Sequence, residues 1–131
     1  MRSELPLQIM RFGAVGGVGF IIDGTLLWLL ITLDFNPFVA RALSFPVAVI
    51  ATWLLNRNWT FRATRNANGK AQFRLYFSVQ LVGSLANYLV YSAVIGVFGT
   101  AFATVFWGFV TGSAVGSVLN FCGARLIAFR V

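Results

Sequence analysis

One carboxylate lies in the middle of a long apolar run near the N-terminus. Asp23 is the single ionisable residue between Phe12 and Leu33. If this run crosses a bilayer, a charge at its centre costs about 2.5 to 3.5 kcal/mol on insertion scales, so the carboxylate must face protein or a water-filled cavity. Asp23 could then pair structurally with Asn87 or Gln80, bind a cation or a proton, or contact sugar hydroxyls.

A second group of polar residues lies at or near the ends of apolar runs. Its members are Arg41, Asn56, Arg57, Asn120 and Arg125. A guanidinium group can hold a phosphate through two parallel hydrogen bonds, so arginine suits phosphate recognition. The alternative is that these side chains only mark the helix ends and extend their polar heads to the membrane surface.

Other kinds of chemistry lack the necessary residues. The chain has no histidine, its acids are Glu4, Asp23 and Asp34, and Cys122 is its one cysteine. These residues form no metal-ligand cluster and no Ser-His-Asp set, and a single cysteine makes no internal disulfide. We therefore expect no metal, no cofactor and no enzymatic activity.

The composition indicates the environment that surrounds these polar residues. Of 131 residues, 59% are hydrophobic and 10% are charged, whereas about a quarter are charged in a soluble domain. The net charge of +7 could indicate a nucleic-acid partner, but apolar runs separate the basic residues and no continuous basic face results. The composition predicts an integral membrane protein, a single domain over residues 1–131, without a nucleic-acid partner.

Four apolar runs are long enough to cross a bilayer, which takes about 20 helical residues. The short Asp34–Pro37 segment has the residues of a tight turn, and Pro37 suits the first position of a helix. Pro46 lies inside the second run, where it should kink the helix. We therefore predict an all-α membrane protein with four transmembrane helices at about residues 12–33, 38–55, 75–98 and 102–121.

Basic residues lie almost entirely on one side of these spans. Arg41 alone falls near the opposite side, and nine others share the side of the termini and central loop: Arg2, Arg11, Arg57, Arg62, Arg65, Lys70, Arg74, Arg125 and Arg130. The positive-inside rule then predicts cytoplasmic termini and a cytoplasmic loop at residues 66–69. It also places Trp59, Phe61 and Phe73 as aromatics at the cytoplasmic interface.

The two halves of the sequence match one another. A shift of 64 residues aligns Gly19 with Gly83 and Asp23 with Asn87. A shift of 68 aligns Arg57, Phe61 and Arg62 with Arg125, Phe129 and Arg130, and it aligns Ala40, Ser44, Ala48 and Thr52 with Gly108, Gly112, Gly116 and Asn120. We interpret the match as two tandem helical hairpins in the same orientation, a parallel repeat.

The aligned small residues recur at every fourth position and form one stripe along a helix. Gly108, Gly112 and Gly116, here called the glycine ridge, let another helix backbone approach closely. The ridge could serve packing within the chain or a contact between copies in a homo-oligomer. Both need the same smooth surface, so the sequence leaves both open.

Two segments resemble a known family. Arg11-Phe12, Val15-Gly16-Gly17 and Asp23 in the first span, with the segment Leu54-Leu55-Asn56-Arg57-Asn58-Trp59-Thr60-Phe61, are similar to the GtrA-like family of four-span bacterial membrane proteins. The resemblance covers essentially the whole chain. One departure is Thr52, where the family often has Asn; Asn120 occupies the equivalent place in the second half.

The resemblance implies a multi-pass protein of the bacterial inner membrane that translocates polyprenyl-phosphate-linked sugars for surface polysaccharide, next to membrane lipid and a membrane glycosyltransferase partner. The intramembrane Asp23, Gln80 and Asn87, with arginines at the entrance, suit a polar path for such a substrate. One alternative is a scaffold that recruits the glycosyltransferase through residues 56–74. Another is a small proton-coupled exporter of organic cations, although a cationic entrance repels such substrates.

Overall fold

The structure, a computed structural model, describes residues 4–64 and 68–130, apart from the side chains of residues 37 and 38. Within these ranges it is all-helical and contains no strand, as predicted. All four long helices have the length and apolar composition needed to cross a membrane. They are α1 (Leu5–Thr32), α2 (Pro37–Leu55), α3 (Gly69–Phe98) and α4 (Phe102–Gly123).

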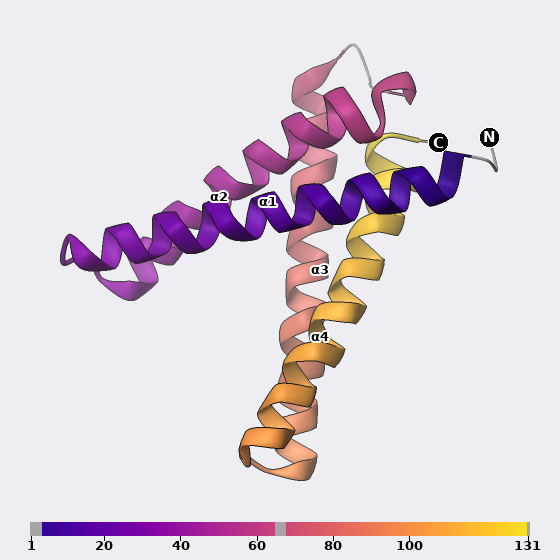
Figure 1. Cartoon of the computed structure of the whole chain (residues 1–131). Helices are drawn as coiled ribbons and strands as arrows, with labels where there is room; N and C mark the ends of the chain where they lie inside the picture. Colours follow the sequence, from indigo (N-terminus) through magenta and orange to yellow (C-terminus); the bar gives the residue numbers. More distant parts are fainter. Residues whose placement is uncertain (1–3, 65–67, 131) are drawn as a thin grey trace. The chain divides into compact units, whose positions relative to one another are not determined.

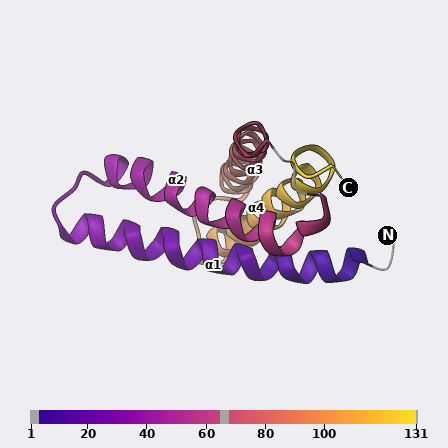
Figure 2. The same ribbon diagram turned by 90° about the horizontal axis from the view of Figure 1, so that it is seen from above.

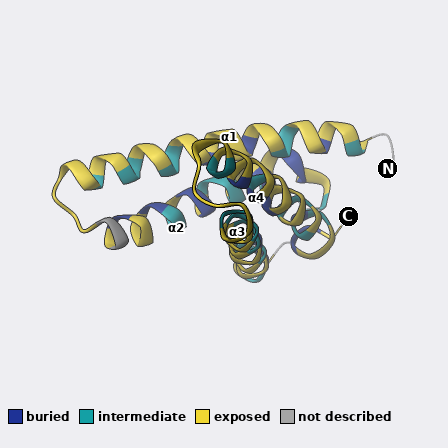
Figure 3. Ribbon diagram, turned by 90° about the horizontal axis from the view of Figure 1, so that it is seen from below, coloured by how far each residue is buried: buried dark blue, intermediate teal, exposed yellow. Residues whose placement is uncertain are grey.

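The contacts divide the chain into two compact units, residues 1–67 and 68–131. In the first unit α1 packs along α2, and in the second α3 packs along α4 (Figures 1 and 2). We call α1 with α2 the first helical pair and α3 with α4 the second helical pair. Exposed residues extend along the helices (Figure 3). Many of them are large and apolar, among them Phe20, Val97 and Phe102. Such surfaces suit a lipid environment, in which the backbone of each helix satisfies its own hydrogen bonds.

Two helices begin earlier than the apolar runs predicted. The first starts at Leu5 instead of near residue 12, with a proline in its first turn, and α3 starts at Gly69 instead of near residue 75. The Asn68 side chain caps α3 by accepting a hydrogen bond of 3.2 Å from the Ala71 backbone amide. Helices of 28 and 30 residues extend about 42 and 45 Å, longer than the hydrocarbon core.

The connection between α1 and α2 is short, as predicted. Asp34 has a φ of 64°, a left-handed conformation that Asp tolerates better than most residues. The Phe35 amide donates to the Leu30 carbonyl at 3.1 Å and closes the turn. Pro37 then begins α2, which continues through Pro46.

Each helical pair ends in a π-helical turn that was not predicted from the sequence. Helix α2 runs into η2 (Asn56–Thr60), followed by the short 3-10 turn η3 (Arg62–Thr64), and α4 runs into η4 (Ala124–Ala128). The Phe61 amide bonds the Asn56 carbonyl, and the Phe129 amide bonds the Ala124 carbonyl, both at 2.8 Å. The two turns are offset by 68 residues, the same shift that aligns the sequence halves.

These turns correct one prediction. Phe61 was expected at the membrane interface, but its side chain is 1% exposed. The wider π turn directs it against α1, where its ring meets Phe12 edge-on with centroids 6.4 Å apart. Phe129 meets Tyr76 of α3 in the same way at 6.1 Å. Phe12 and Tyr76 are 64 residues apart, so both sequence shifts recur in the contacts.

Candidate functional site

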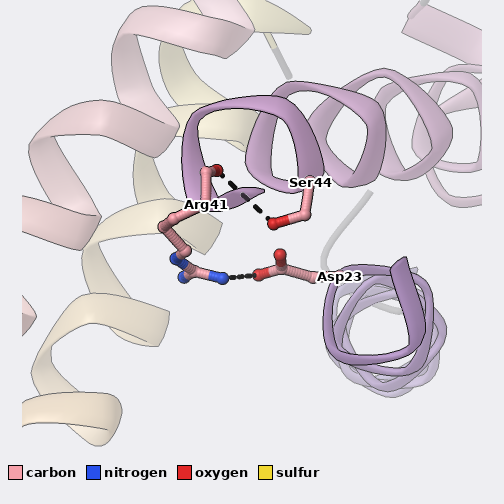
Figure 4. A network of polar contacts seen from close by, with 3 residues as sticks. All are labelled: Asp23, Arg41 and Ser44. Atoms are coloured by element: carbon pink, nitrogen blue, oxygen red, sulfur yellow. Dashed lines mark hydrogen bonds and ion pairs between the residues drawn. The ribbon is translucent and has the colours of Figure 1, made fainter. Parts of the chain in front are cut away.

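The first helical pair contains an ion pair between its two helices (Figure 4). Arg41 Nη1 on α2 donates to Asp23 Oδ2 on α1 at 2.5 Å. The Asp23 side chain is 17% exposed and the Arg41 side chain 54% exposed. The other carboxylate oxygen, Asp23 Oδ1, is buried and has no hydrogen-bond partner within residues 4–64 and 68–130. The acid is therefore held by one contact and keeps free acceptor capacity.

Small residues bring the two helices close enough for this contact. Ala40, Ser44 and Ala48 form a buried stripe on α2. Gly19 lies one turn before Asp23 on the same face of α1, and a Cβ added to it would collide with the Thr52 side chain. The close approach leaves a carboxylate at position 23 within reach of the arginine beside the stripe.

The sequence predicted other partners for Asp23. Asn87 and Gln80 belong to the second unit, and a pairing with them stays a prediction. The ion pair could have been found from charge: between Phe12 and Leu55 the charged residues are Asp23, Asp34 and Arg41. One cation and one anion at membrane depth on adjacent helices are expected to pair.

Asn56 and Arg57 lie in the turn η2 and face different surroundings. The Asn56 side chain is 1% exposed, and its Oδ1 accepts a hydrogen bond of 2.8 Å from the Thr60 hydroxyl. Asn56 therefore stabilises the π turn from within. The guanidinium of Arg57 lies over the Trp53 ring, 5.6 Å from its centroid, a distance that gives a cation–π attraction.

In the second helical pair, the glycine ridge lies buried against α3. A Cβ added to Gly112 would be 2.6 Å from the backbone oxygen of Asn87, and one added to Gly116 would be 2.8 Å from that of Gly83. The ridge thus serves close packing inside the second unit, one of the two uses that the sequence left open.

The second helical pair also contains buried polar atoms that lack a hydrogen-bond partner among the described residues. Asn120 on α4 lies against Gly83, where an added Cβ would collide with its amide. Asn120 Oδ1 and Gln80 Nε2 are both buried and lack a hydrogen-bond partner in the part of the chain that the structure describes. Arg125 lies in η4, five residues after Asn120, with its side chain partly exposed.

The structure therefore unites some of the predicted site residues and not others. It brings Asp23 to Arg41, Asn87 to the glycine ridge, and Asn120 to Gly83. The described residues contain no cluster of three side chains that could hold a metal ion. Arg2 and Arg65, two of the basic residues used for the orientation, lie outside the described residues, as do Asn66 and Ala67 of the central loop.

Four candidate spans, joined in close-packed pairs with charged and amide side chains between them, define a multi-pass membrane protein. The chain belongs to the family described as "GtrA/DPMS, transmembrane domain", which matches residues 11–129. The resemblance noted from the sequence is thereby confirmed.

Two relatives extend the comparison. The chain is 25% identical over 119 residues to the uncharacterized membrane protein YngA of Bacillus subtilis (strain 168), a match that covers 91% of this chain and 77% of the relative. It is 24% identical over 125 residues to a dolichol-phosphate mannosyltransferase of Pyrococcus furiosus. That match covers 94% of this chain and 32% of the mannosyltransferase, so the chain corresponds to about a third of that protein.

Proposed function

We propose that this protein translocates a polyprenyl-phosphate-linked sugar across the bacterial inner membrane, without covalent chemistry, for the synthesis or modification of surface polysaccharide. Family membership supports a link to lipid-phosphate sugars, because one relative is named for dolichol phosphate and mannose. The lipid tail of such a substrate stays in the bilayer. The protein then needs to supply only a polar path for one sugar and one phosphate charge.

The observation that carries this proposal is the unused hydrogen-bonding capacity between the helices. Asp23 Oδ1, Gln80 Nε2 and Asn120 Oδ1 are buried without a hydrogen-bond partner among the described residues. An unsatisfied buried polar atom costs about 1 to 3 kcal/mol. Sugar hydroxyls both donate and accept hydrogen bonds, so a passing sugar is a suitable partner for such atoms.

The orientation belongs to the same proposal. Both termini and the central loop face the cytoplasm, because their basic residues are retained on that side. The two pairs then form a parallel repeat, which the recurring contacts of the π turns support. Arg57 and Arg125 lie at matching cytoplasmic helix ends, where they receive the lipid phosphate.

Reconstitution tests the proposal. Purified protein in liposomes with a labelled polyprenyl-phosphate sugar should accelerate the appearance of the label in the opposite leaflet. Empty liposomes and liposomes with an unrelated four-span protein are the controls. No acceleration by protein that circular dichroism shows to be folded would reject the flippase.

A scaffold is the second candidate, and one comparison favours it. In the Pyrococcus furiosus mannosyltransferase, the segment similar to this chain is part of a longer protein. A separate chain could likewise position a membrane glycosyltransferase through residues 56–74. Neutral substitutions at Asp23 and Gln80 would then leave surface glycosylation intact, whereas substitutions in residues 56–74 would abolish it. The Asp23–Arg41 ion pair argues against a cation exporter, since the acid already has a cation.

Assembly as a homo-oligomer stays part of the proposal. The glycine ridge is covered by α3, so copies of the chain must meet through another face. Crosslinking in native membranes tests this, and a monomer as the sole product would reject it.

A further inference from the structure

The Arg41 side chain points away from the nearer end of its helix. Arg41 lies four residues after Pro37, the start of α2, and Asp23 lies nine residues before Thr32, the end of α1. At 1.5 Å per residue, these positions are about 6 and 14 Å from the connection between the helices. The guanidinium therefore reaches deeper into the helical pair to meet the acid. An arginine near the end of a span normally extends toward the nearer membrane surface.

The contact that holds Arg41 in this direction is incomplete. A guanidinium has five donors in a planar fork, suited to two parallel bonds with one anion. Arg41 makes a single nitrogen–oxygen contact with Asp23, and its guanidinium also lies over the Phe45 ring, 5.8 Å from the centroid. Its side chain is 54% exposed. Donors of Arg41 are thus available to a second anion that approaches from the exposed side.

Asp23 also has an alternative partner. The Ser44 hydroxyl lies on the side of α2 that faces Asp23 (Figure 4). It now donates to the Arg41 backbone carbonyl over a long 3.4 Å, and rotation about its side-chain bond would direct it to a carboxylate. If Arg41 were drawn away, Ser44 could donate to the oxygen that Arg41 had left.

We infer that Arg41 is a receptor for a lipid-linked phosphate on the outer side of the membrane, and that Asp23 occupies this receptor until the phosphate displaces it. The inference rests on the proposed function and on its orientation, which puts the α1–α2 connection on the outer side. A phosphate ester accepts both arms of the guanidinium fork, whereas the carboxylate uses one. Asp23 in turn competes with the phosphate and favours its release.

The test removes the competitor and keeps the receptor. Asp23→Asn preserves size and abolishes the charge that holds Arg41, so a short-chain polyprenyl phosphate should bind about tenfold more tightly, which corresponds to ~1.4 kcal/mol. Binding is titrated with the full-length protein in nanodiscs of a neutral lipid. Asp23→Glu, which keeps the competing charge, is the matched control and should show no such gain in affinity. Unchanged affinity in folded Asp23→Asn protein would overturn the inference.

A charge exchange separates the receptor from a structural ion pair. The double variant Asp23→Arg, Arg41→Asp restores two opposite charges and should recover the thermal stability that either single change loses. It should not recover phosphate binding, because position 41 then repels an anion. If the exchanged protein binds phosphate as tightly as the native chain, the ion pair has only a structural role and the inference is overturned.

Arg41→Lys provides a second route if the variants at position 23 do not fold. Lysine keeps the charge and an ion pair with Asp23 but loses the planar fork. Phosphate binding should weaken several-fold while the melting temperature stays close to native, and native binding would overturn the inference.

Binding of other phosphate compounds identifies which kind of phosphate the site recognises. Inorganic phosphate and phosphatidylglycerol should each bind much more weakly than the polyprenyl phosphate, and equal affinity for either would reject the lipid-linked substrate. A native protein that binds polyprenyl phosphate at Arg41 without translocating the linked sugar would reject the flippase and keep the receptor. If the native protein translocates the linked sugar but Asp23→Asn leaves phosphate binding unchanged, the flippase is kept and the receptor is rejected.

Discussion

Gln72 of α3 donates a hydrogen bond from its side-chain Nε2 to the backbone carbonyl of Ala128 in the turn η4, over 3.3 Å. Both residues are buried, at 1% and 4% exposed. The bond satisfies a carbonyl in a π turn and ties the end of α4 to the neighbouring helix. Gln8, 64 residues earlier, is likewise buried in the first helical pair.

Replacing Gln72 by Leu should destabilise the second helical pair. The change leaves the Ala128 carbonyl buried without its donor, which costs about 1 to 3 kcal/mol. The loss should appear as a lower melting temperature of the purified protein in detergent, measured by circular dichroism.

Gln80 supplies the matched control. It lies on the same helix, but its Nε2 has no hydrogen-bond partner among the described residues. Gln80→Leu should therefore leave the melting temperature unchanged or raise it. Equal losses from the two substitutions would show that the Gln72 bond contributes no specific stability.

Gly112→Ala should disturb the contact between α3 and α4. The added Cβ would lie 2.6 Å from the backbone oxygen of Asn87, and a backbone atom cannot move aside as a side chain can. Forcing an extra methyl group into a filled interface costs about 1 to 3 kcal/mol. Thermal unfolding would measure the loss.

Gly96→Ala is the control for this glycine prediction. A Cβ at Gly96 meets nothing within 4 Å, and alanine favours a helix over glycine by about 1 kcal/mol. This variant should be as stable as the native chain or more so. If Gly112→Ala matched it, the close approach at the glycine ridge would be wrong.

The proposed orientation predicts that positions 69 and 100 face opposite sides of the membrane. Cysteines placed there in a Cys122→Ser background should differ in intact cells, with position 100 labelled by an impermeant maleimide and position 69 protected. Position 100 is preferred to Gly99, whose φ of 93° disfavours a side chain. External labelling of both positions would exclude the four-span arrangement.

Arg57 and Arg125 should lose substrate handling when both are changed to lysine. The substitution keeps the charge and the orientation signal but removes the two-donor fork that fits a phosphate. Surface glycosylation should fall while protein abundance in the membrane stays normal. The double variant Arg62→Lys, Arg130→Lys makes the same chemical change on the same side and should have no effect. Normal glycosylation in the first double variant would remove both residues from the site.

Much of the fold could be predicted from the sequence, because the length of an apolar run and the charges at its ends can be read for each helix separately. The spans and the short turn at Asp34 follow from patterns within one segment, and the equivalence of Arg57 and Arg125 follows from the match between the two halves of the sequence. The early start of α3 was missed because Asn68 acts through local capping, whereas the prediction followed apolar length. The burial of Phe61 was missed because a π turn changes which face a residue takes, and hydrophobic periodicity assumes the α-helical repeat.

The site was predicted less completely, for a related reason. Asp23 was identified because its cost at membrane depth depends on residue type alone. Its partner depends on how two helices align, so Arg41 was grouped with the candidate phosphate ligands near the helix ends and was not paired with Asp23. The hydrogen bond between Asn56 and the Thr60 hydroxyl was also missed, because the sequence of a helix end does not distinguish an amide that faces a substrate from one that bonds a neighbouring side chain.

The division into two compact units has a consequence for biosynthesis. Every contact described within the first unit joins residues no later than Thr64. The ribosome therefore delivers all the chain that the Asp23–Arg41 contact and the first π turn require before α3 is made. Contacts between segments close in sequence form quickly, because little loop-closure entropy opposes them. The carboxylate, which is costly in lipid, can thus reach its cation while the nascent chain still lies at the insertion machinery.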